Sequence, residues 1–181
     1  IMIGGEIYRG ATGVAGEIGH VAIDPGGPEC VCGNRGCLAT FVGTRQLVDR
    51  ARSLMSRFPD SALAGTEPDI RAIEDAALAD DPLARQVVNE AADRLGIVVA
   101  GVLNLLNPGS VVLGGSLARV GDRLVKPLRE AVATRTLVAS AAASDIRTSD
   151  LGERATALGA ATHVLVAALA NPQLFPGVKT A

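Results

Sequence analysis

The sequence predicts a mixed α/β domain in which helices and strands pack in layers around one core. Segments with strand patterning and segments with helical periodicity follow one another along the 181 residues. Hydrophobic residues make up 48% of the sequence and the mean hydropathy is +0.31, which is sufficient apolar content for a folded domain. Aromatic residues make up only 2%, so the core is expected to consist of Ala, Val, Leu and Ile.

The N-terminal region is expected to begin with a hairpin. Residues 1–8, IMIGGEIY, have the pattern of a strand, a Gly-Gly turn and a second strand. A glycine-rich loop follows. Residues 21–24, VAID, are predicted to form a short strand that ends at Pro25 and Gly26.

Two helices separated by a loop are predicted next. Thr44 is predicted to be the N-cap of a helix that runs to about Met55. Residues 57–69 are rich in Pro, Gly and Ser, which favours a loop on the surface. Residues 70–78 are predicted to form a short helix.

The longest helix is predicted to begin at Asp81-Pro82, with Asp at the N-cap and Pro at the first helical position. Its second half, residues 97–106, is apolar on nearly every side and is expected to be deeply buried. The sequence Asn-Pro-Gly at residues 107–109 is expected to end it. Residues with helical spacing are Leu83, Val87, Val88, Ala91, Leu95, Val98, Val99, Val102 and Leu106.

The remaining residues are predicted to form two strands and two helices. SVVLGGSLA, residues 110–118, is expected to be a buried strand that ends in a Gly-Gly turn. A helix over 119–134, a strand over 144–150 and a last helix over 153–170 follow. Residues 171–181 are expected to form a loose tail.

The charge and hydropathy of the chain exclude two classes of partner. The net charge is −2 and the isoelectric point about 5.7, which does not suit a face that binds nucleic-acid phosphates. There is no run of eighteen or more apolar residues and no signal peptide pattern. We therefore expect no membrane partner and a cytoplasmic location.

All three cysteines and one of the two histidines lie within residues 17–37, EIGHVAIDPGGPECVCGNRGC. His20, Cys30, Cys32 and Cys37 supply three thiolates and one imidazole, a complete tetrahedral ligand set for structural zinc. Gly33 permits the tight turn that the spacing requires, as does Gly36. The sequence therefore predicts a structural Zn²⁺ ion as cofactor.

Three alternatives to structural zinc are weaker. Free buried cysteines do not suit Cys-Val-Cys flanked by Gly, Asn and Arg. One disulfide would leave an odd thiol, and nothing in the sequence indicates secretion. A zinc knuckle for single-stranded nucleic acid would need aromatic and basic residues in the loop, where Arg35 stands nearly alone.

These motifs resemble the ROK family of bacterial repressors, sugar kinases and related open reading frames. The family pattern is E-x-G-H followed by C-x-C-G-x-x-G-C-x-E. LNPGSVVLGGSLA and TALGAATHVL also resemble later family segments, so the resemblance extends from Ile3 to about Ala170. Matching motif residues are Glu17, Gly19, His20, Cys30, Cys32, Gly33, Gly36 and Cys37.

The resemblance implies the actin-like, ribonuclease-H-like fold of two lobes around a cleft, with this chain as the second lobe. Residues 1–170 would form that lobe, and residues 17–40 its zinc-bound loop. The first lobe and any DNA-binding domain are then expected outside these residues. Because the catalytic Asp and the phosphate loop of family kinases lie in the other part, this chain alone is not expected to catalyse phosphoryl transfer.

The resemblance also implies a sugar site. In family kinases the Glu and His of E-x-G-H hold sugar hydroxyls, which makes Glu17 and His20 the sugar-binding candidates. Zinc on one ring nitrogen would fix the orientation of the imidazole. A third contact, the family Glu two residues after the last Cys, is Ala39 here. Loss of the usual sugar affinity or preference is therefore expected.

A nucleotide site is implied more weakly. Only the adenosine side could lie in this chain, around Gly114, Gly115 and Ser116, and a Gly-Gly turn is equally explained as a tight connection. His163, among Ala, Thr, Val and Leu, is interpreted as a packed or half-exposed helix residue without a catalytic role.

Three functions follow as hypotheses. In a ROK-type transcriptional regulator, the lobes sense a sugar or dimerise, and such a protein tolerates Ala39. A kinase for glucose or an N-acetylated hexosamine is favoured by the intact Glu17 and His20. The third is a dimerisation module without a ligand. The expected partners are a sugar or sugar phosphate, a second copy of the chain, and DNA only through a separate N-terminal domain.

Overall fold

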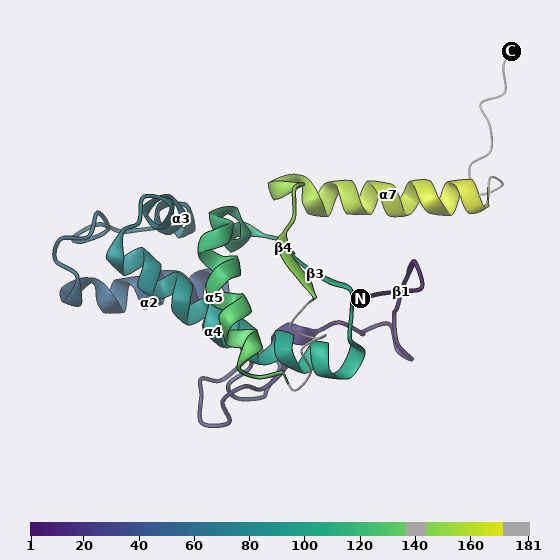
Figure 1. Ribbon diagram of the computed structural model, residues 1–181, viewed down its shortest axis with the longest axis horizontal. Helices are drawn as coiled ribbons and strands as arrows, with labels where there is room; N and C mark the ends of the chain where they lie inside the picture. Colours follow the sequence, from purple (N-terminus) through teal and green to yellow (C-terminus); the bar gives the residue numbers. More distant parts are fainter. Residues whose placement is uncertain (137–143, 172–181) are drawn as a thin grey trace, which may run out of the picture.

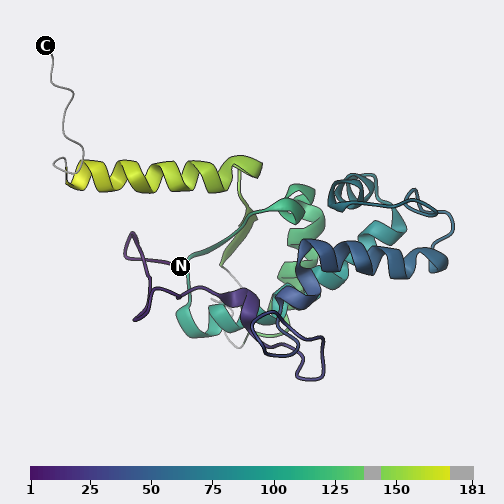
Figure 2. The same ribbon diagram turned by 180° about the vertical axis from the view of Figure 1, so that it is seen from behind.

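The computed structural model describes residues 1–136 and 144–171. In these residues the predicted mixed α/β class is confirmed, with helices forming the main body and strands occurring in two separate pairs (Figure 1). The body consists of α2 (Thr44–Leu54), α3 (Ile70–Leu78), α4 (Pro82–Leu106) and α5 (Asp122–Ala133). A further helix, α7 (Ala155–Ala170), extends away from this body in both views (Figures 1 and 2).

The predicted N-terminal hairpin is confirmed. Strands β1 (Met2–Ile3) and β2 (Glu6–Ile7) pair antiparallel. The strand predicted over residues 21–24 is wrong, because only Ala22 pairs there, in a single bridge to Cys37. The chain turns toward the cysteine loop instead, and the N–H groups of residues 23 and 24 both donate to the carbonyl of Gly36.

Helix boundaries agree best where capping residues specify them. The predicted bounds of α3 and α4 are confirmed, and Asn107 ends α4 in the left-handed conformation with φ 42°. The first helix is confirmed, but its N-cap is Gly43 rather than Thr44, which is the first helical residue. Helix α5 begins at Asp122, three residues later than predicted, because a 3-10 helix, η3 (Ser116–Val120), precedes it.

The two C-terminal strands form a parallel pair. Strand β3 (Ser110–Leu113) lies beside β4 (Asp145–Thr148), with Val111 opposite Ile146. Helix α5 lies between them in the chain, as a parallel connection requires. Because parallel strands end at the same edge, the turn after β3 and the start of η4 (Gly152–Arg154) lie near one another.

The core lies around α4 and contains no aromatic residue among the fully buried side chains that the structure describes, as predicted. Helices α4 and α5 approach closely at Gly96, where an added Cβ would lie 2.5 Å from the Cβ of Ala131. The largest buried aliphatic side chains are Leu54, Ile73, Leu83, Leu103, Leu128 and Ile146.

Three burial predictions are wrong. Strand β3 was expected to be buried, but Val112 is 47% exposed, and Val111 and Leu113 are only partly buried. The loop over 57–69 was expected on the surface, but Ser61 and Leu63 are buried. The end of α4 was expected to be buried on every side, but Leu105 is 84% exposed and Leu106 is 48% exposed. The buried α4 side chains pack against neighbouring helices, whereas none of the described elements covers this face of its last turn.

Helix α7 begins at Ala155, two residues later than predicted, and none of its residues is buried. His163 is exposed, and Arg9 donates a hydrogen bond to its Nε2 atom at 3.1 Å. No helix in residues 1–136 and 144–171 combines the length and the apolar character needed to span a bilayer. Most of the predicted loose tail, residues 172–181, lies outside the described residues.

Asp81 joins the buried loop to the start of α4. Its Oδ1 atom accepts hydrogen bonds from the backbone N–H groups of Leu83 and Ala84 and from the Ser61 hydroxyl. Its Oδ2 atom accepts one from the N–H of Ala62 at 2.8 Å. Burial alone would raise the pKa of Asp81, but these four donors outweigh it and lower the pKa below its ordinary value.

Replacement of Asp81 by Ala is expected to destabilise the protein by about 3 kcal/mol at pH 7, because it removes a helix cap and leaves buried donors without an acceptor. Since its folded-state pKa is depressed, the wild-type contribution is present above an unfolded pKa of about 3.9 and is lost as pH falls through the folded value. Urea unfolding at pH 7 and pH 3 measures both effects. Asp69→Ala is the matched control, since that N-cap is exposed and accepts one bond, from Ala72; an equal loss for both variants would contradict the prediction.

Candidate metal centre

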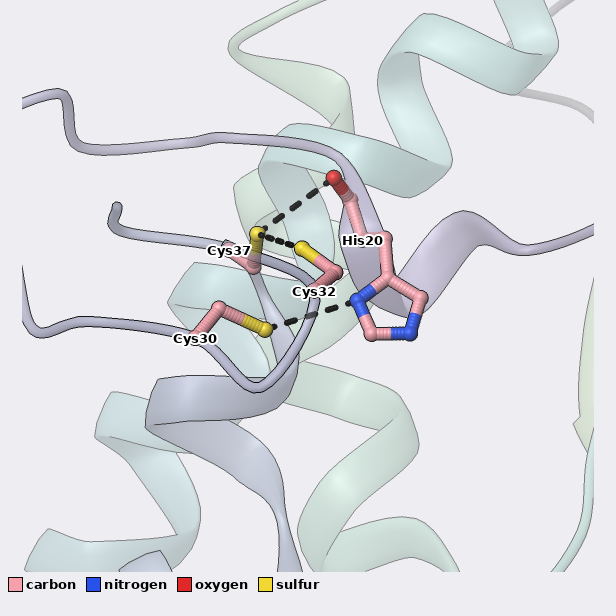
Figure 3. Close-up of side chains that lie close together, drawn as sticks. All are labelled: His20, Cys30, Cys32 and Cys37. Atoms are coloured by element: carbon pink, nitrogen blue, oxygen red, sulfur yellow. Dashed lines mark hydrogen bonds between the residues drawn. The ribbon is translucent and has the colours of Figure 1, made fainter. Parts of the chain in front are cut away.

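The four predicted ligands come together from three segments (Figure 3). His20 ends a 3-10 helix, η1 (Ile18–His20), Cys30 and Cys32 lie on a small turn, and Cys37 lies just before α1 (Ala39–Val42). The ligand atoms of all four residues lie within 4.8 Å of one another. Among the described residues this is the one His/Cys/Asp/Glu group found that could hold a metal ion.

The distances fit a tetrahedral ion. Zinc bonds of about 2.3 Å to sulfur and 2.0–2.1 Å to nitrogen imply about 3.8 Å between two ligand sulfurs and about 3.6 Å between sulfur and nitrogen. The Sγ atoms of Cys32 and Cys37 lie 3.6 Å apart, and the Sγ of Cys30 lies 3.4 Å from Nδ1 of His20. All three cysteines are free, so the predicted ligand set can hold a metal ion of this size.

A short backbone hairpin holds the first two cysteines. Glu29 and Arg35 form an antiparallel bridge, and their side chains form an ion pair at 2.8 Å. The N–H of Cys30 donates to the carbonyl of Asn34 at 2.8 Å, and the N–H of Gly33 donates back to Cys30 at 2.9 Å. Gly33 has φ +90°, which confirms that the turn requires glycine.

Gly36 closes the loop onto the preceding segment. Its φ is +63°, and a Cβ built on it would lie 1.5 Å from the carbonyl oxygen of Asp24. Its own N–H donates to the carbonyl of Pro28 at 2.7 Å. This contact places Cys37 opposite Ala22 and next to the other three ligands.

The thiols occupy different environments. Cys37 is fully buried, and burial raises the pKa of its thiol to about 12. Cys32 is exposed, and a hydrogen bond from the backbone N–H of Asn34 lowers the pKa of its thiol to about 7. A thiolate at the buried position therefore requires a nearby cation, which a bound metal ion supplies.

The second nitrogen of His20 faces away from the cysteines. Its Nε2 atom lies 3.9 Å from a carboxylate oxygen of Glu17, a largely exposed side chain. Ala39 lies beside the same segment, because a Cβ built on Gly19 would lie 3.7 Å from the Cβ of Ala39. The structure thus brings Ala39 close to the segment that carries the two predicted sugar-binding residues.

The residues of the predicted nucleotide site line a separate cavity of about 810 Å³. Gly114, Gly115 and Ser116 form one wall, after the carboxyl end of β3. Helix α3 contributes Glu74 to another wall, and η3 contributes Arg119. Sequence reasoning did not identify these last two residues.

A signal for Glu74 was present in the sequence. In α3, Ile70, Ile73 and Ala77 recur at helical spacing, and Glu74 falls on the same apolar face. Glu74 is only 2% exposed. A carboxylate on the buried face of a helix indicates a specific partner, here Arg119, whose Nε donates to its Oε2 at 2.7 Å.

The comparisons with known proteins agree with one another. The family model described as ROK family matches residues 1–167. The xylose repressor of Caldicellulosiruptor bescii is 32% identical over 96% of this chain and 44% of its own length. A solved ROK family transcriptional regulator, a homologue of the E. coli MLC protein, gives a TM-score of 0.73 at 31% identity, covering 80% of this chain and 37% of its own.

The same part of this chain is also similar to sugar kinases. The structure of a ROK family glucokinase from Streptomyces griseus, in complex with glucose and AMPPNP, gives a TM-score of 0.79 at 27% identity. The alignment covers 90% of this chain and 55% of that protein. The chain spans about half the length of the curated relatives it matches, which include both repressors and glucokinases.

Proposed function

Because the chain belongs to the ROK family and forms a mixed α/β lobe of the actin-like ATPase fold, we propose that it is the sugar-sensing or dimerising lobe of a ROK-type transcriptional regulator. Residues 1–170 form the second of two lobes in this proposal. The first lobe and a DNA-binding domain belong to other parts of the full-length protein. DNA is contacted only through that domain, and the protein works in the cytoplasm as a homodimer or larger assembly.

Zinc has a structural role in this proposal. His20, Cys30, Cys32 and Cys37 would hold it with all four tetrahedral positions filled, which leaves none for a substrate. When bound, the ion supplies the positive charge that stabilises the thiolates. His20 then has a fixed ring orientation, with Nε2 on the side of Glu17, where it can hydrogen-bond a sugar hydroxyl.

The observation that carries the regulator proposal is Ala39. The family pattern has a Glu at this position, and the alanine lies beside the segment that holds Glu17 and His20. Its methyl group offers no hydrogen bond to a sugar hydroxyl. A sensor tolerates weaker or altered sugar binding, whereas a kinase must hold the reacting hydroxyl in place.

A second candidate is the corresponding half of an ATP-dependent sugar kinase. The retained Glu17 and His20 favour it, as does the similarity to a glucokinase that binds glucose and AMPPNP. In this case the residues 114–116 contact the adenosine part of a nucleotide. The sugar would be glucose or an N-acetylated hexosamine.

One experiment with the full-length protein separates the two candidates. DNA from upstream of its own gene is titrated with the protein while xylose, glucose and N-acetylglucosamine are added, and ATP consumption is measured in parallel. A regulator is expected to bind the DNA, to change its affinity with one sugar and to consume no ATP. Sugar-dependent ATP consumption without DNA binding would instead support the kinase.

The same titration tests the sugar site through two variants. Ala39→Glu is expected to raise affinity for the effective sugar about 10-fold, because it adds a charged acceptor. Glu17→Ala is expected to weaken binding by a similar factor. If neither variant changes the sugar titration, the sugar lies elsewhere and the roles of both positions are wrong.

A further inference from the structure

Glu74 has an unused hydrogen-bonding atom in a buried position. Its Oε2 atom accepts from Arg119, but its Oε1 atom has no hydrogen-bond partner in residues 1–136 and 144–171. A buried carboxylate oxygen without a donor costs folding free energy of about 1–3 kcal/mol. Such an atom is retained at a cost to stability, and its position calls for a partner such as an ordered water, an ion or a ligand.

The ion pair with Arg119 leaves one carboxylate oxygen of Glu74 without a hydrogen-bond donor among the described residues. Arg119 holds Oε2 through its Nε atom and directs its Nη2 atom to Asp75, the next residue of α3. Rotation of the carboxylate would only exchange two equivalent oxygens. One oxygen of Glu74 therefore always remains as an acceptor beside the cavity that Glu74 lines.

The cavity has the size and lining of a small-molecule site. Its volume of about 810 Å³ lies within the usual range for ligand pockets. Ile70 and Leu151 supply apolar surface, and Gly114 and Gly115 expose flat peptide groups. A Cβ built on either glycine would meet no atom within 4 Å, so no packing within the described residues requires the space beside them.

The position of the cavity in the fold favours ligand binding. The cavity lies at the carboxyl ends of the parallel strands β3 and β4, where open α/β sheets bind their ligands. A flat, partly apolar molecule with an N–H or O–H donor satisfies both the glycine wall and the carboxylate. A nucleoside meets these requirements, through either its exocyclic amino group or its ribose hydroxyls.

We infer that Oε1 of Glu74 accepts a hydrogen bond from the nucleoside part of a nucleotide bound in this cavity, and that Glu74 selects among nucleotides. The inference rests on the assignment of residues 114–116 to a nucleotide in the second candidate function, the sugar kinase. It adds a specificity-determining residue from α3 that the family motifs of the sequence do not contain.

The test uses Glu74→Gln in the full-length protein. Because Arg119 donates to one atom of residue 74, the amide oxygen must face it, and the amide NH₂ then takes the place of Oε1. The variant therefore presents a donor where wild type presents an acceptor. Affinities for ATP, ITP and dATP are measured by calorimetry with Mg²⁺ and without sugar.

Two outcomes support the inference and identify the donor. If the amino group is the donor, wild type prefers ATP over ITP about 10-fold or more, and Glu74→Gln reverses that preference. If a ribose hydroxyl is the donor, wild type prefers ATP over dATP, and Glu74→Ala removes that preference. A residue with only a structural role would lower stability without changing either ratio.

Two control variants keep the outcomes distinct. Asp75→Ala removes the other hydrogen-bond partner of Arg119 at an exposed position and is expected to change no affinity by more than about 2-fold. Gly114→Val is expected to fold, since its Cβ would meet no atom of the described residues within 4 Å, and to weaken nucleotide binding at least about 10-fold by placing a branched side chain on the glycine wall of the cavity.

Each failure has a separate meaning. If no nucleotide binds wild type saturably, or if Gly114→Val binds as well as wild type, the nucleotide assignment of residues 114–116 is wrong and the inference falls with it. If Gly114→Val weakens binding while the Glu74 variants keep the wild-type preferences, the nucleotide assignment stands and only the role of Glu74 is wrong.

Discussion

Gly36→Ala is expected to destroy the loop of residues 17–43 and to abolish metal binding there. A Cβ at this position would lie 1.5 Å from the carbonyl oxygen of Asp24, and both groups belong to the backbone of a closed loop. The positive φ adds a cost of about 1–2 kcal/mol for any residue other than glycine. The total loss of stability is expected to exceed about 4 kcal/mol, a range reached only by severe steric or network disruption.

Gly33→Ala separates the steric clash from the cost of the backbone conformation. Gly33 lies in the same loop with φ +90°, but an added Cβ would meet no atom within 4 Å. Its alanine variant is expected to lose only about 1–2 kcal/mol and to retain metal. Urea unfolding and elemental analysis of both purified variants provide the comparison. If the two variants lost equal stability and held equal amounts of metal, the close contact between Gly36 and the Asp24 carbonyl would be contradicted.

Removal of the metal is expected to lower stability by about 4 kcal/mol at a free zinc concentration of 1,000 times its Kd. For a domain of this size the corresponding decrease in Tm is roughly 8–16 °C. The physical reason is that Cys37 must become a buried thiolate, which only the cation stabilises. Differential scanning calorimetry before and after complete chelation measures the change.

The loss is expected to be local. Among the described residues, the buried members of the main core begin at Leu47, so the helical body has an apolar core that does not contain the ligands. Hydrogen exchange after chelation should increase over residues 17–43 while α4 stays protected. Cys32→Ser is the control, because it lacks one of the four ligands, and chelation should lower its stability little further. If neither the Tm nor the hydrogen exchange of residues 17–43 changed after complete metal removal, a structural role for the ion would be ruled out.

Local sequence signals predicted the helices whose ends are determined by local contacts. Asp81-Pro82 and Asn107-Pro108 mark the two ends of α4, because capping depends on residues a few positions apart. The burial of Ser61 and Leu63 was missed because it depends on the distant Asp81. The strand over residues 21–24 failed for a similar reason, since its backbone donors are used by Gly36.

The metal ligands could be predicted because residue type and spacing together leave few other interpretations. The cavity at the ends of β3 and β4 could be predicted only in part. Gly114 and Gly115 were visible as a turn, but the pairing of Glu74 with Arg119 joins residues 45 positions apart. Periodicity places Glu74 on the buried face of α3, yet only the fold shows which side chain faces it.

Helix α7 has a consequence for the helix–coil equilibrium of the chain. It contains 16 residues, none of them buried, and its Leu165 and Leu169 are 61% and 82% exposed. A helix of this length without tertiary packing is only marginally stable in water and exchanges with coil within about a microsecond. The helicity of residues 155–170 therefore depends on whatever packs against their apolar side chains, and the circular dichroism of the chain will report that packing.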